Sequence, residues 1–102
     1  NGGYYATYGA AKAGVIMYTK YLAQQLGQYN INVNSIAPAY VGTKRLNYLS
    51  FDEKGEEICK GIALGRICEP NDIAKVINFL VSEDADYITG QCISACGGAI
   101  NF

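Results

Sequence analysis

The sequence predicts an α/β fold in which helices alternate with parallel strands. Apolar residues recur at steps of three and four along residues 8–26, which is the period of an amphipathic helix. A stretch rich in β-branched residues follows at residues 31–37 and ends at Pro38. The same order of helix and strand returns between Pro70 and Ser94, and such alternation is typical of a parallel sheet covered by helices.

The first predicted helix contains one apolar stripe and has a candidate signal at each end. Thr7 could cap its start with the side-chain hydroxyl, and Gly27 is suited to its stop. The strand that follows completes half of a parallel α/β unit. The residues expected on the buried stripe are Ala11, Val15, Tyr18, Leu22 and Leu26.

Residues 39–65 follow no single period and include a cluster of charges between residues 52 and 57. We expect a long loop with one or two short helices, a common design for a substrate lid. Tyr40 and Tyr48 in this lid segment could line an apolar or ring-shaped substrate site. The tyrosines elsewhere in the chain, apart from Tyr8, are expected to pack in a core or an interface.

The second half of the pattern begins at Pro70, which suits the first position of a helix, and Asp72 favours the positive end of that helix. An acidic turn at residues 82–86 ends this helix. A last short strand at residues 91–94 then leads to a glycine pair, Gly97 and Gly98. The apolar stripe expected on the second helix comprises Ile73, Val76, Ile77 and Leu80.

Tyr8 and Lys12 form the candidate reaction centre. Their spacing of four places both side chains on one face of a helix, although tyrosine and lysine also mix often on solvated faces. An ammonium about 4 Å away, at an effective dielectric of about 20, would stabilise a phenolate by roughly 4 kcal/mol. That is enough to bring a phenol pKa of about 10 towards neutrality, where a tyrosine can exchange a proton with a carbonyl or an alcohol. Tyr40 and Lys44 share the spacing, but Pro38 and Gly42 disfavour a regular helix there.

Composition argues against several other classes of function. The net charge is −1 and the eight basic residues are scattered, so no nucleic-acid footprint is expected. No apolar run approaches ~20 residues and no basic-then-apolar leader opens the sequence, so neither a membrane span nor a signal peptide is expected. The chain has no histidine, and its four cysteines lack Cys-x-x-Cys spacing, so histidine triads and a zinc site are not expected. The lack of a disulfide pattern points to the cytoplasm.

Four motifs follow one another along nearly the whole chain. They are Tyr8-Gly-Ala-Ala-Lys12-Ala-Gly, Val33-Asn-Ser-Ile-Ala-Pro38 with Val41 and Thr43, Leu64-Gly-Arg66 with Glu69-Pro70, and Tyr87-Ile-Thr-Gly90-Gln91 with Gly97-Gly98. Their order and spacing resemble the C-terminal part of the short-chain dehydrogenase/reductase family. Among its subgroups, the residues of these motifs are most similar to those of the 3-oxoacyl-acyl-carrier-protein reductases and the related sugar-alcohol dehydrogenases. The resemblance implies that residues 1–102 are the C-terminal catalytic and substrate part of one Rossmann-like doubly wound parallel sheet, with its first strands missing.

The resemblance also implies a role for each matching residue. Tyr8 would be the catalytic acid and base, and Lys12 would hold the ribose hydroxyls of NAD or NADP, with NADP slightly favoured by the subgroup. The loop after Pro38 would lie against the nicotinamide, and loops at the carboxyl ends of parallel strands are where open α/β sheets bind ligands. The implied cofactor-binding residues are Tyr8, Lys12, Pro38, Ala39, Val41 and Thr43.

Three positions depart from the family pattern and put local loop order in question. Ala39 replaces the usual glycine after Pro38, which is tolerable if its φ is negative. Cys96 replaces an aspartate before the glycine pair, and so removes an acceptor that normally ties down the last loop. Asn32 stands where arginine is frequent.

The family's glycine-rich cofactor turn and its catalytic serine and asparagine lie before the tyrosine, yet only seven residues precede Tyr8. The sequence therefore predicts a fragment with two of the four catalytic residues, inactive by itself. Two parallel strands without their neighbours would also leave apolar faces and edges uncovered. We expect marginal stability or association of the isolated chain.

Two functions from different classes stay open. The first is an oxidoreductase that transfers a hydride reversibly between NAD(P)H and a small-molecule ketone or secondary alcohol, with a 3-oxoacyl thioester as one candidate. The second is a non-catalytic oligomerisation module or a degenerate relative, because the first helix and the last helix and strand resemble the surfaces that build dimers and tetramers in this family. A homo-dimer or homo-tetramer is expected for the full-length protein in either case.

Overall fold

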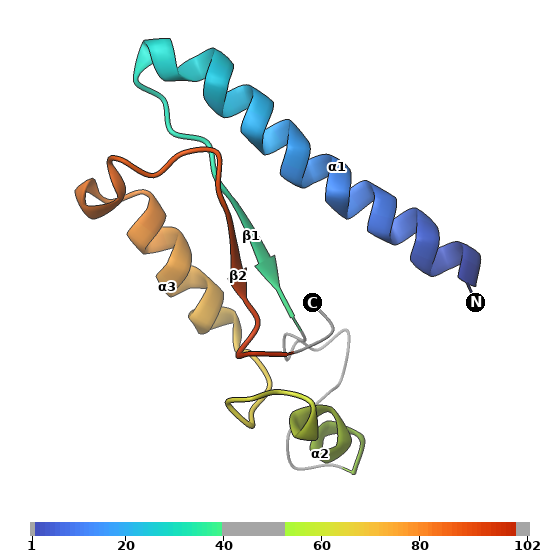
Figure 1. Cartoon of the computed structure of the whole chain (residues 1–102). Helices are drawn as coiled ribbons and strands as arrows, with labels where there is room; N and C mark the ends of the chain where they lie inside the picture. Colours follow the sequence, from blue (N-terminus) through green and yellow to red (C-terminus); the bar gives the residue numbers. More distant parts are fainter. Residues whose placement is uncertain (1, 40–52, 100–102) are drawn as a thin grey trace. The chain divides into compact units, whose positions relative to one another are not determined.

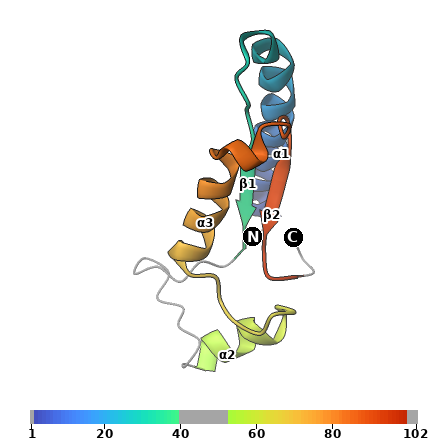
Figure 2. The same ribbon diagram turned by 90° about the vertical axis from the view of Figure 1, so that its left-hand side faces the viewer.

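The computed structural model describes residues 2–39 and 53–99. In order, it contains α1 (Gly2–Leu26), the 3₁₀ turn η1 (Gly27–Tyr29), β1 (Ser35–Pro38), α2 (Glu53–Lys60), α3 (Pro70–Leu80), the 3₁₀ turn η2 (Glu83–Ala85) and β2 (Cys92–Ala95) (Figure 1). β1 and β2 form a two-stranded sheet. Their arrows run in the same direction in Figures 1 and 2, so the sheet is parallel. The predicted α/β fold is confirmed.

The chain divides into two compact units, and the boundary passes through both strands. The first unit comprises residues 1–35 and 82–93, and the second comprises residues 36–81 and 94–102. The first unit therefore contains α1 and both 3₁₀ turns, and the second contains α2 and α3.

The helix α1 extends further than the sequence predicts. It begins at Gly2, so Thr7 lies inside the helix and the predicted cap at Thr7 is wrong. A helix gains one hydrogen bond for each residue added, and no proline interrupts residues 2–7. The α-helix does end at Leu26, as predicted, but Gly27 is not the left-handed residue. That residue is Asn30, with φ of 60°, after the intervening turn η1.

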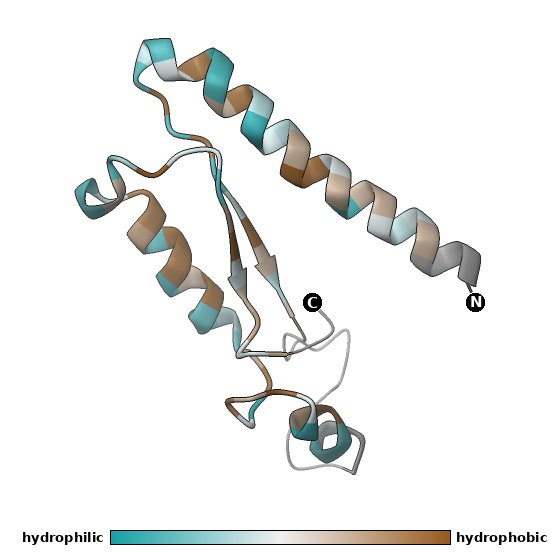
Figure 3. Cartoon of the chain, in the orientation of Figure 1, coloured by the Kyte–Doolittle hydropathy of each residue, from teal (hydrophilic) through white to brown (hydrophobic). Residues whose placement is uncertain are grey.

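The buried side of α1 matches the predicted stripe only at the end of the helix, where Leu22 and Leu26 are half-buried. Val15 and Tyr18 are 53% and 64% exposed, whereas Thr19 and Ala23 are buried. Figure 3 shows hydrophobic residues along much of this helix, and these residues are spread around its axis instead of gathering on a single face. The small residue Ala23 instead packs against Gly90, where an added Cβ would lie 3.3 Å from the Ala23 Cβ. The φ of Gly90 is +74°, a value that other residues adopt only with strain.

The segment before β1 is held largely by asparagine side chains, together with a backbone bond from the Gly90 N–H to Val33 O at 2.7 Å. The strand begins at Ser35 instead of residue 31. Asn32 Nδ2 donates hydrogen bonds to the carbonyl oxygens of Ala85, Asp86 and Ile88 at 3.3, 3.0 and 3.1 Å. Asn34 adds a bond from its Nδ2 to Ile88 O and accepts one from the Gln91 N–H at its Oδ1. Such side-chain hydrogen bonds compete with the backbone hydrogen bonds that would pair the two strands. Loop order is thus maintained with Asn32 in the place of the family's arginine.

The helix α3 begins as predicted, with Pro70 at its first turn. Glu69 is the N-cap residue, and it forms a reciprocal capping box with Asp72, whose Oδ2 accepts the Glu69 N–H at 2.8 Å. The helix ends at Leu80, and η2 occupies the predicted acidic turn. The strand β2 begins one residue later than predicted, at Cys92.

Close backbone packing orders the segment after β2. Gly97 and Gly98 have φ of +61° and +83°, and an added Cβ would lie 2.9 Å from Ile62 Cγ2 and 2.6 Å from Ala63 Cβ, respectively. The Leu64 N–H also donates to Gly97 O at 2.9 Å. These contacts hold the loop although Cys96 replaces the family's aspartate.

Part of the predicted lid is described. Helix α2 lies within residues 39–65, as one of the short helices expected there. Tyr40, Val41, Thr43 and Tyr48 lie outside the described residues. Among the described residues, no helix combines the length and the apolar character needed to cross a membrane.

Candidate functional site

The helix α1 brings Tyr8 and Lys12 together on one face, which confirms the placement expected from their spacing. Lys12 Nζ lies 5.3 Å from the centroid of the Tyr8 ring, within the range of a cation–π contact. The Tyr8 side chain is 48% exposed, and Lys12 is exposed as well. Both groups are therefore accessible to a ligand, and the ammonium lies over the ring.

The far end of α1 is fixed within the first unit. Thr19 and Ala23 are its buried residues, and Lys20 Nζ donates to Gly90 O at 3.4 Å. Thr19 Oγ1 donates to Val15 O at 2.8 Å, which satisfies its buried hydroxyl within the helix. Tyr8 lies about three helical turns before this anchor. A continuous helix transmits the position of the anchor to the Tyr8 side chain.

Pro38 and Ala39 lie at the carboxyl end of β1 and are half-buried. Among the described residues other than glycine, only Asn30 has a positive φ. The φ of Ala39 is therefore negative, which is the condition under which alanine can replace the family's glycine at this position. Pro38 and Ala39 belong to the second unit, whereas Tyr8 and Lys12 belong to the first. The other predicted cofactor and lid residues, Val41, Thr43, Tyr40 and Tyr48, fall outside the described part of the chain.

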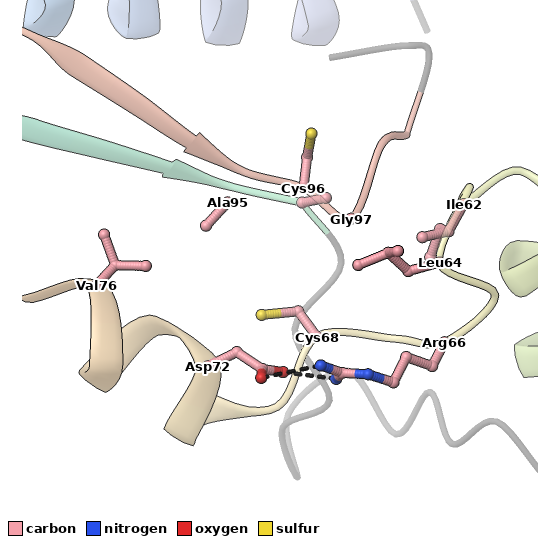
Figure 4. Close-up of a pocket in the computed structure, with 10 residues that line it drawn as sticks. Ile62, Leu64, Arg66, Cys68, Asp72, Val76, Ala95, Cys96 and Gly97 are labelled. Carbon is pink, nitrogen blue, oxygen red and sulfur yellow. Dashed lines mark hydrogen bonds and ion pairs between the residues drawn. The ribbon is translucent and has the colours of Figure 1, made fainter.

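The second unit contains a pocket of about 220 Å³ that sequence reasoning missed. It is lined by Ala39, by residues 62–68, by the start of α3 and by residues 95–97 at the end of β2 (Figure 4). Its apolar walls include Ile62, Leu64, Val76 and Ala95, and Cys68 also lines it. Helix periodicity predicts Val76 on an inward face, but a hollow formed by four separate segments leaves no periodic signal in a sequence.

An ion pair borders this pocket. Arg66 Nη1 and Nη2 donate to Asp72 Oδ2 and Oδ1 at 2.7 and 3.0 Å, a bidentate arrangement. These bonds, with a further bond from the Glu69 N–H, hold the pKa of the Asp72 carboxyl well below its usual range. The same bonds raise the pKa of Arg66. The pKa of the Cys68 thiol is raised chiefly by burial and also by the Asp72 charge, so this thiol stays protonated at neutral pH.

Comparison with known proteins identifies the family. A family model described as enoyl-(acyl carrier protein) reductase matches residues 1–99. The chain is 46% identical over 98 residues to the cyclohexanol dehydrogenase of Rhodococcus sp. (strain TK6). The alignment covers 96% of this chain and 36% of that protein. The chain belongs to the short-chain dehydrogenase/reductase family. The family predicted from the four sequence motifs is thus confirmed.

Other members of the short-chain dehydrogenase/reductase family agree. The 3-oxoacyl-acyl-carrier-protein reductase of Chlamydia trachomatis serovar D is 45% identical over 91 residues, covering 89% of this chain and 36% of that protein. A blue fluorescent protein from a metagenomic library, solved in complex with NADPH, superimposes with a TM-score of 0.81 at 29% identity, over 91% of this chain and 37% of that one. The chain therefore spans a little over a third of the length of these relatives.

Proposed function

We propose that this chain provides the proton-transfer residues and part of the cofactor site of an NAD(P)-dependent oxidoreductase that acts on a ketone or a secondary alcohol. The observation that carries the proposal is the pairing of Tyr8 and Lys12, with Nζ 5.3 Å from the ring centroid and both side chains accessible. Membership of the short-chain dehydrogenase/reductase family supports it, as does the NADPH bound to one structural relative.

The residues divide the chemistry between them. A bound nicotinamide cofactor would supply the hydride in reduction and accept it in oxidation. In reduction the Tyr8 hydroxyl donates its proton to the carbonyl oxygen, so that the ketone gains a hydride and a proton and becomes an alcohol. Lys12 stabilises the negative charge that remains on the Tyr8 oxygen and donates hydrogen bonds to the ribose hydroxyls.

The residues that the structure describes fit such a cofactor. The Lys12 ammonium is exposed and retains its N–H donors when it lies over an aromatic ring, because that contact uses the ring face. Pro38 and Ala39 lie at the end of a parallel strand, where α/β sheets bind ligands. We assign Val41 and Thr43 to the same cofactor loop, and Tyr40 and Tyr48 to the substrate side of the lid, from the sequence pattern.

The finer assignments rest on similarity. A 3-oxoacyl thioester is the substrate we favour, and NADP the cofactor, because the sequence is similar to a 3-oxoacyl-acyl-carrier-protein reductase and NADPH is bound in a structural relative. We further propose a homo-dimer or homo-tetramer of the full-length protein. A cytoplasmic location is proposed because Cys59, Cys68, Cys92 and Cys96 are all free thiols.

The test compares two tyrosines on the same helix. In the full-length protein, Tyr8→Phe should lower kcat for NADPH-dependent reduction of an acetoacetyl thioester by about 10²-fold to 10⁴-fold, because the proton donor is lost. Tyr18→Phe is the matched control, since Tyr18 also lies on α1 and is exposed, and it should leave kcat unchanged. Turnover is followed through NADPH absorbance. Retention of full activity by Tyr8→Phe would overturn the proposal.

One observation favours the alternative of a non-catalytic association module. Val15, Met17, Tyr18 and Tyr21 expose large apolar side chains along α1, which suits contact with another polypeptide. Under this alternative, Met17→Lys would lower the oligomeric state of the full-length protein, and no ketone would be turned over with NADPH or NADH. Turnover that is lost in Tyr8→Phe decides for the oxidoreductase.

A further inference from the structure

We propose that the pocket of the second unit binds a compact apolar molecule carrying an oxygen acceptor, either a carboxylate or a carbonyl, which receives hydrogen bonds from Arg66. The proposal goes beyond the oxidoreductase function, because it depends on no atom of Tyr8 or Lys12, although Ala39, which we assign to the cofactor loop, also lines the pocket. It rests on the size of the pocket, the character of its walls, the hydrogen-bonding capacity of Arg66 and the position of the pocket in the sheet.

The size of the pocket suits a ring with a small head group. Its volume is about 220 Å³. An apolar protein cavity of about 150 Å³ stays dry and binds benzene. The pocket therefore has room for a six-membered ring together with one carboxylate or carbonyl substituent.

The walls of the pocket are mainly apolar. Ile62, Val76 and Ala95 line it from three segments of the second unit, and Figure 4 shows their side chains around a common space. Leu64 also lines it, yet it is 71% exposed. A bound hydrocarbon would cover the Leu64 side chain and remove its apolar surface from water, which favours binding.

Arg66 supplies the polar contact. A guanidinium has five N–H donors and no acceptor. The described contacts of Arg66 join Nη1 and Nη2 to Asp72 and Nη1 to Ile67 O, and none uses Nε. Asp72 already accepts from both Arg66 and the Glu69 N–H. These bonds use three of the roughly four acceptor sites of the Asp72 carboxylate, whereas the described contacts leave the Arg66 Nε–H unused, which favours an acceptor on the ligand over an ammonium.

The pocket also occupies the edge of the sheet where ligands are bound in α/β proteins. Ala39 follows the carboxyl end of β1, and Cys96 and Gly97 follow that of β2; all three residues line the pocket. Open parallel sheets place their ligand sites outside these strand ends. The bidentate ion pair holds the guanidinium in a fixed orientation, which lowers the entropic cost of binding.

Cys68 provides a reporter inside the pocket. Figure 4 shows its Sγ pointing among the lining side chains, whereas the Sγ of Cys96 points away from them. A ligand that fills the pocket must cover the Cys68 thiol. Cys59 and Cys92 do not line the pocket and serve as internal controls.

The experiment measures alkylation of each cysteine by N-ethylmaleimide in the full-length protein, read by mass spectrometry at about pH 9 to provide thiolate. Cyclohexanecarboxylate is the probe, and a millimolar dissociation constant is expected for a ligand of this size. At ten times that concentration, alkylation of Cys68 should slow about ten-fold, while Cys59 and Cys92 react as before. Cyclohexyltrimethylammonium, a cation with the same ring that cannot react with the maleimide, should protect Cys68 far less.

Two substitutions on α3 provide matched controls. Val76→Phe fills the pocket and should abolish protection, whereas Ile77→Phe adds bulk at a neighbouring residue that does not line the pocket and should retain it. Tyr8→Phe should also retain protection, which separates this site from the proposed reaction centre. Absence of protection at ~50 mM probe, equal protection by the cation, or equal slowing at Cys59 would overturn the proposal. If Val76→Phe does not fold, the comparison of anion and cation on the unaltered protein decides.

Discussion

At the scale of single residues, the Lys12 ammonium lies over the face of the Tyr8 ring, 5.3 Å from its centroid. The cation is thereby attracted by the ring quadrupole and still has N–H donors to offer a ligand. One lysine can therefore influence the charge on the Tyr8 oxygen and bind the cofactor ribose at the same time. Such a double role explains why the proposed site needs these two residues one helical turn apart.

Lys12→Met tests this double role. The substitution should raise KM for NADPH at least about ten-fold, because charge-assisted hydrogen bonds to the ribose are lost, and should lower kcat as well. Steady-state kinetics of the full-length protein provide the measurement. Lys75→Met, at an exposed lysine on α3, is the control and should change neither parameter. An unchanged KM in Lys12→Met would remove the lysine from the cofactor site.

Asp72 gives a prediction for the dependence of stability on pH. Its pKa in the folded protein lies below the unfolded value of about 4, so the contribution of its charge to stability is present above that pH and is lost as pH falls. In urea unfolding, Asp72→Asn should have a lower midpoint than the wild type at pH 7. The difference between the two midpoints should shrink below about pH 4, because the wild-type carboxyl then becomes protonated. Asp84→Asn, at the start of η2, should show no such convergence. A deficit that is constant from neutral to acid pH would contradict the assignment.

At the scale of elements, the buried residues described on α1 are small, whereas most of its large apolar side chains are exposed. Thr19 and Ala23 are buried, whereas Val15, Tyr18 and Tyr21 are more than half exposed. Because apolar side chains occur all around this helix, periodicity alone could not identify the buried face. The deciding partner is Gly90, which is remote in sequence and lies against Ala23 without a side chain.

Gly90→Ala should destabilise the protein by about 1–3 kcal/mol, since the substitution strains a backbone at φ +74° and crowds the Ala23 Cβ at 3.3 Å. Chemical denaturation gives the change in the free energy of unfolding. Gly14→Ala is the control, because Gly14 lies in α1 with no atom within 4 Å of an added Cβ. It should stabilise the helix by up to about 1 kcal/mol. A neutral Gly90→Ala would show that the contact does not position α1.

The start of β1 shows a second limit of sequence reasoning. The alternation of β-branched and polar residues predicts a strand from residue 31, but the amide groups of Asn32 and Asn34 bind backbone groups of residues 85–91. An asparagine can pair as part of a β-strand or bind backbone carbonyls through its side chain, and the outcome depends on which carbonyls lie nearby. Here those carbonyls are more than 50 residues away along the chain. Strand ends marked by proline, such as Pro38, need no distant partner and are predicted correctly.

At the scale of the whole molecule, little of the described chain is deeply buried. The buried apolar residues are Ala23, Ile62, Ile67 and Ala85, and no large side chain of the described residues is fully buried. The described tyrosines, including Tyr18, Tyr21, Tyr29 and Tyr87, are exposed, so they do not pack in a core of the described chain. Packing in an interface, the other placement expected from the sequence, stays a prediction. Exposed apolar area of this kind favours association.

The 102-residue chain, prepared by itself, should therefore associate or unfold without a sharp transition. Sedimentation velocity should show species heavier than the monomer at micromolar concentration, and Met17→Lys with Tyr21→Lys should reduce them. Glu56→Lys, which changes charge on α2, is the control for a general effect of added lysine. A compact monomer with cooperative unfolding would contradict this prediction.

The order of the elements, the family and the shared face of Tyr8 and Lys12 could all be predicted, since each depends on local spacing or on motif order. The pocket could not be predicted, because it requires segments that are far apart in the sequence. The Arg66–Asp72 contact joins residues only six apart, but it depends on the path of the irregular chain before α3, which has no periodic pattern. Local periodicity describes which elements form, and only their packing shows which side chains meet.

The glycine pair after β2 bears on how substitution data for this protein should be interpreted. Positions 97 and 98 have backbone angles and neighbours that admit no larger residue. In a survey of random variants, both would rank among the least tolerant sites, because any side chain there would strain the backbone and crowd its neighbours. Ranking residues by intolerance would therefore mistake steric crowding for chemistry, unless binding and abundance of each variant were scored separately.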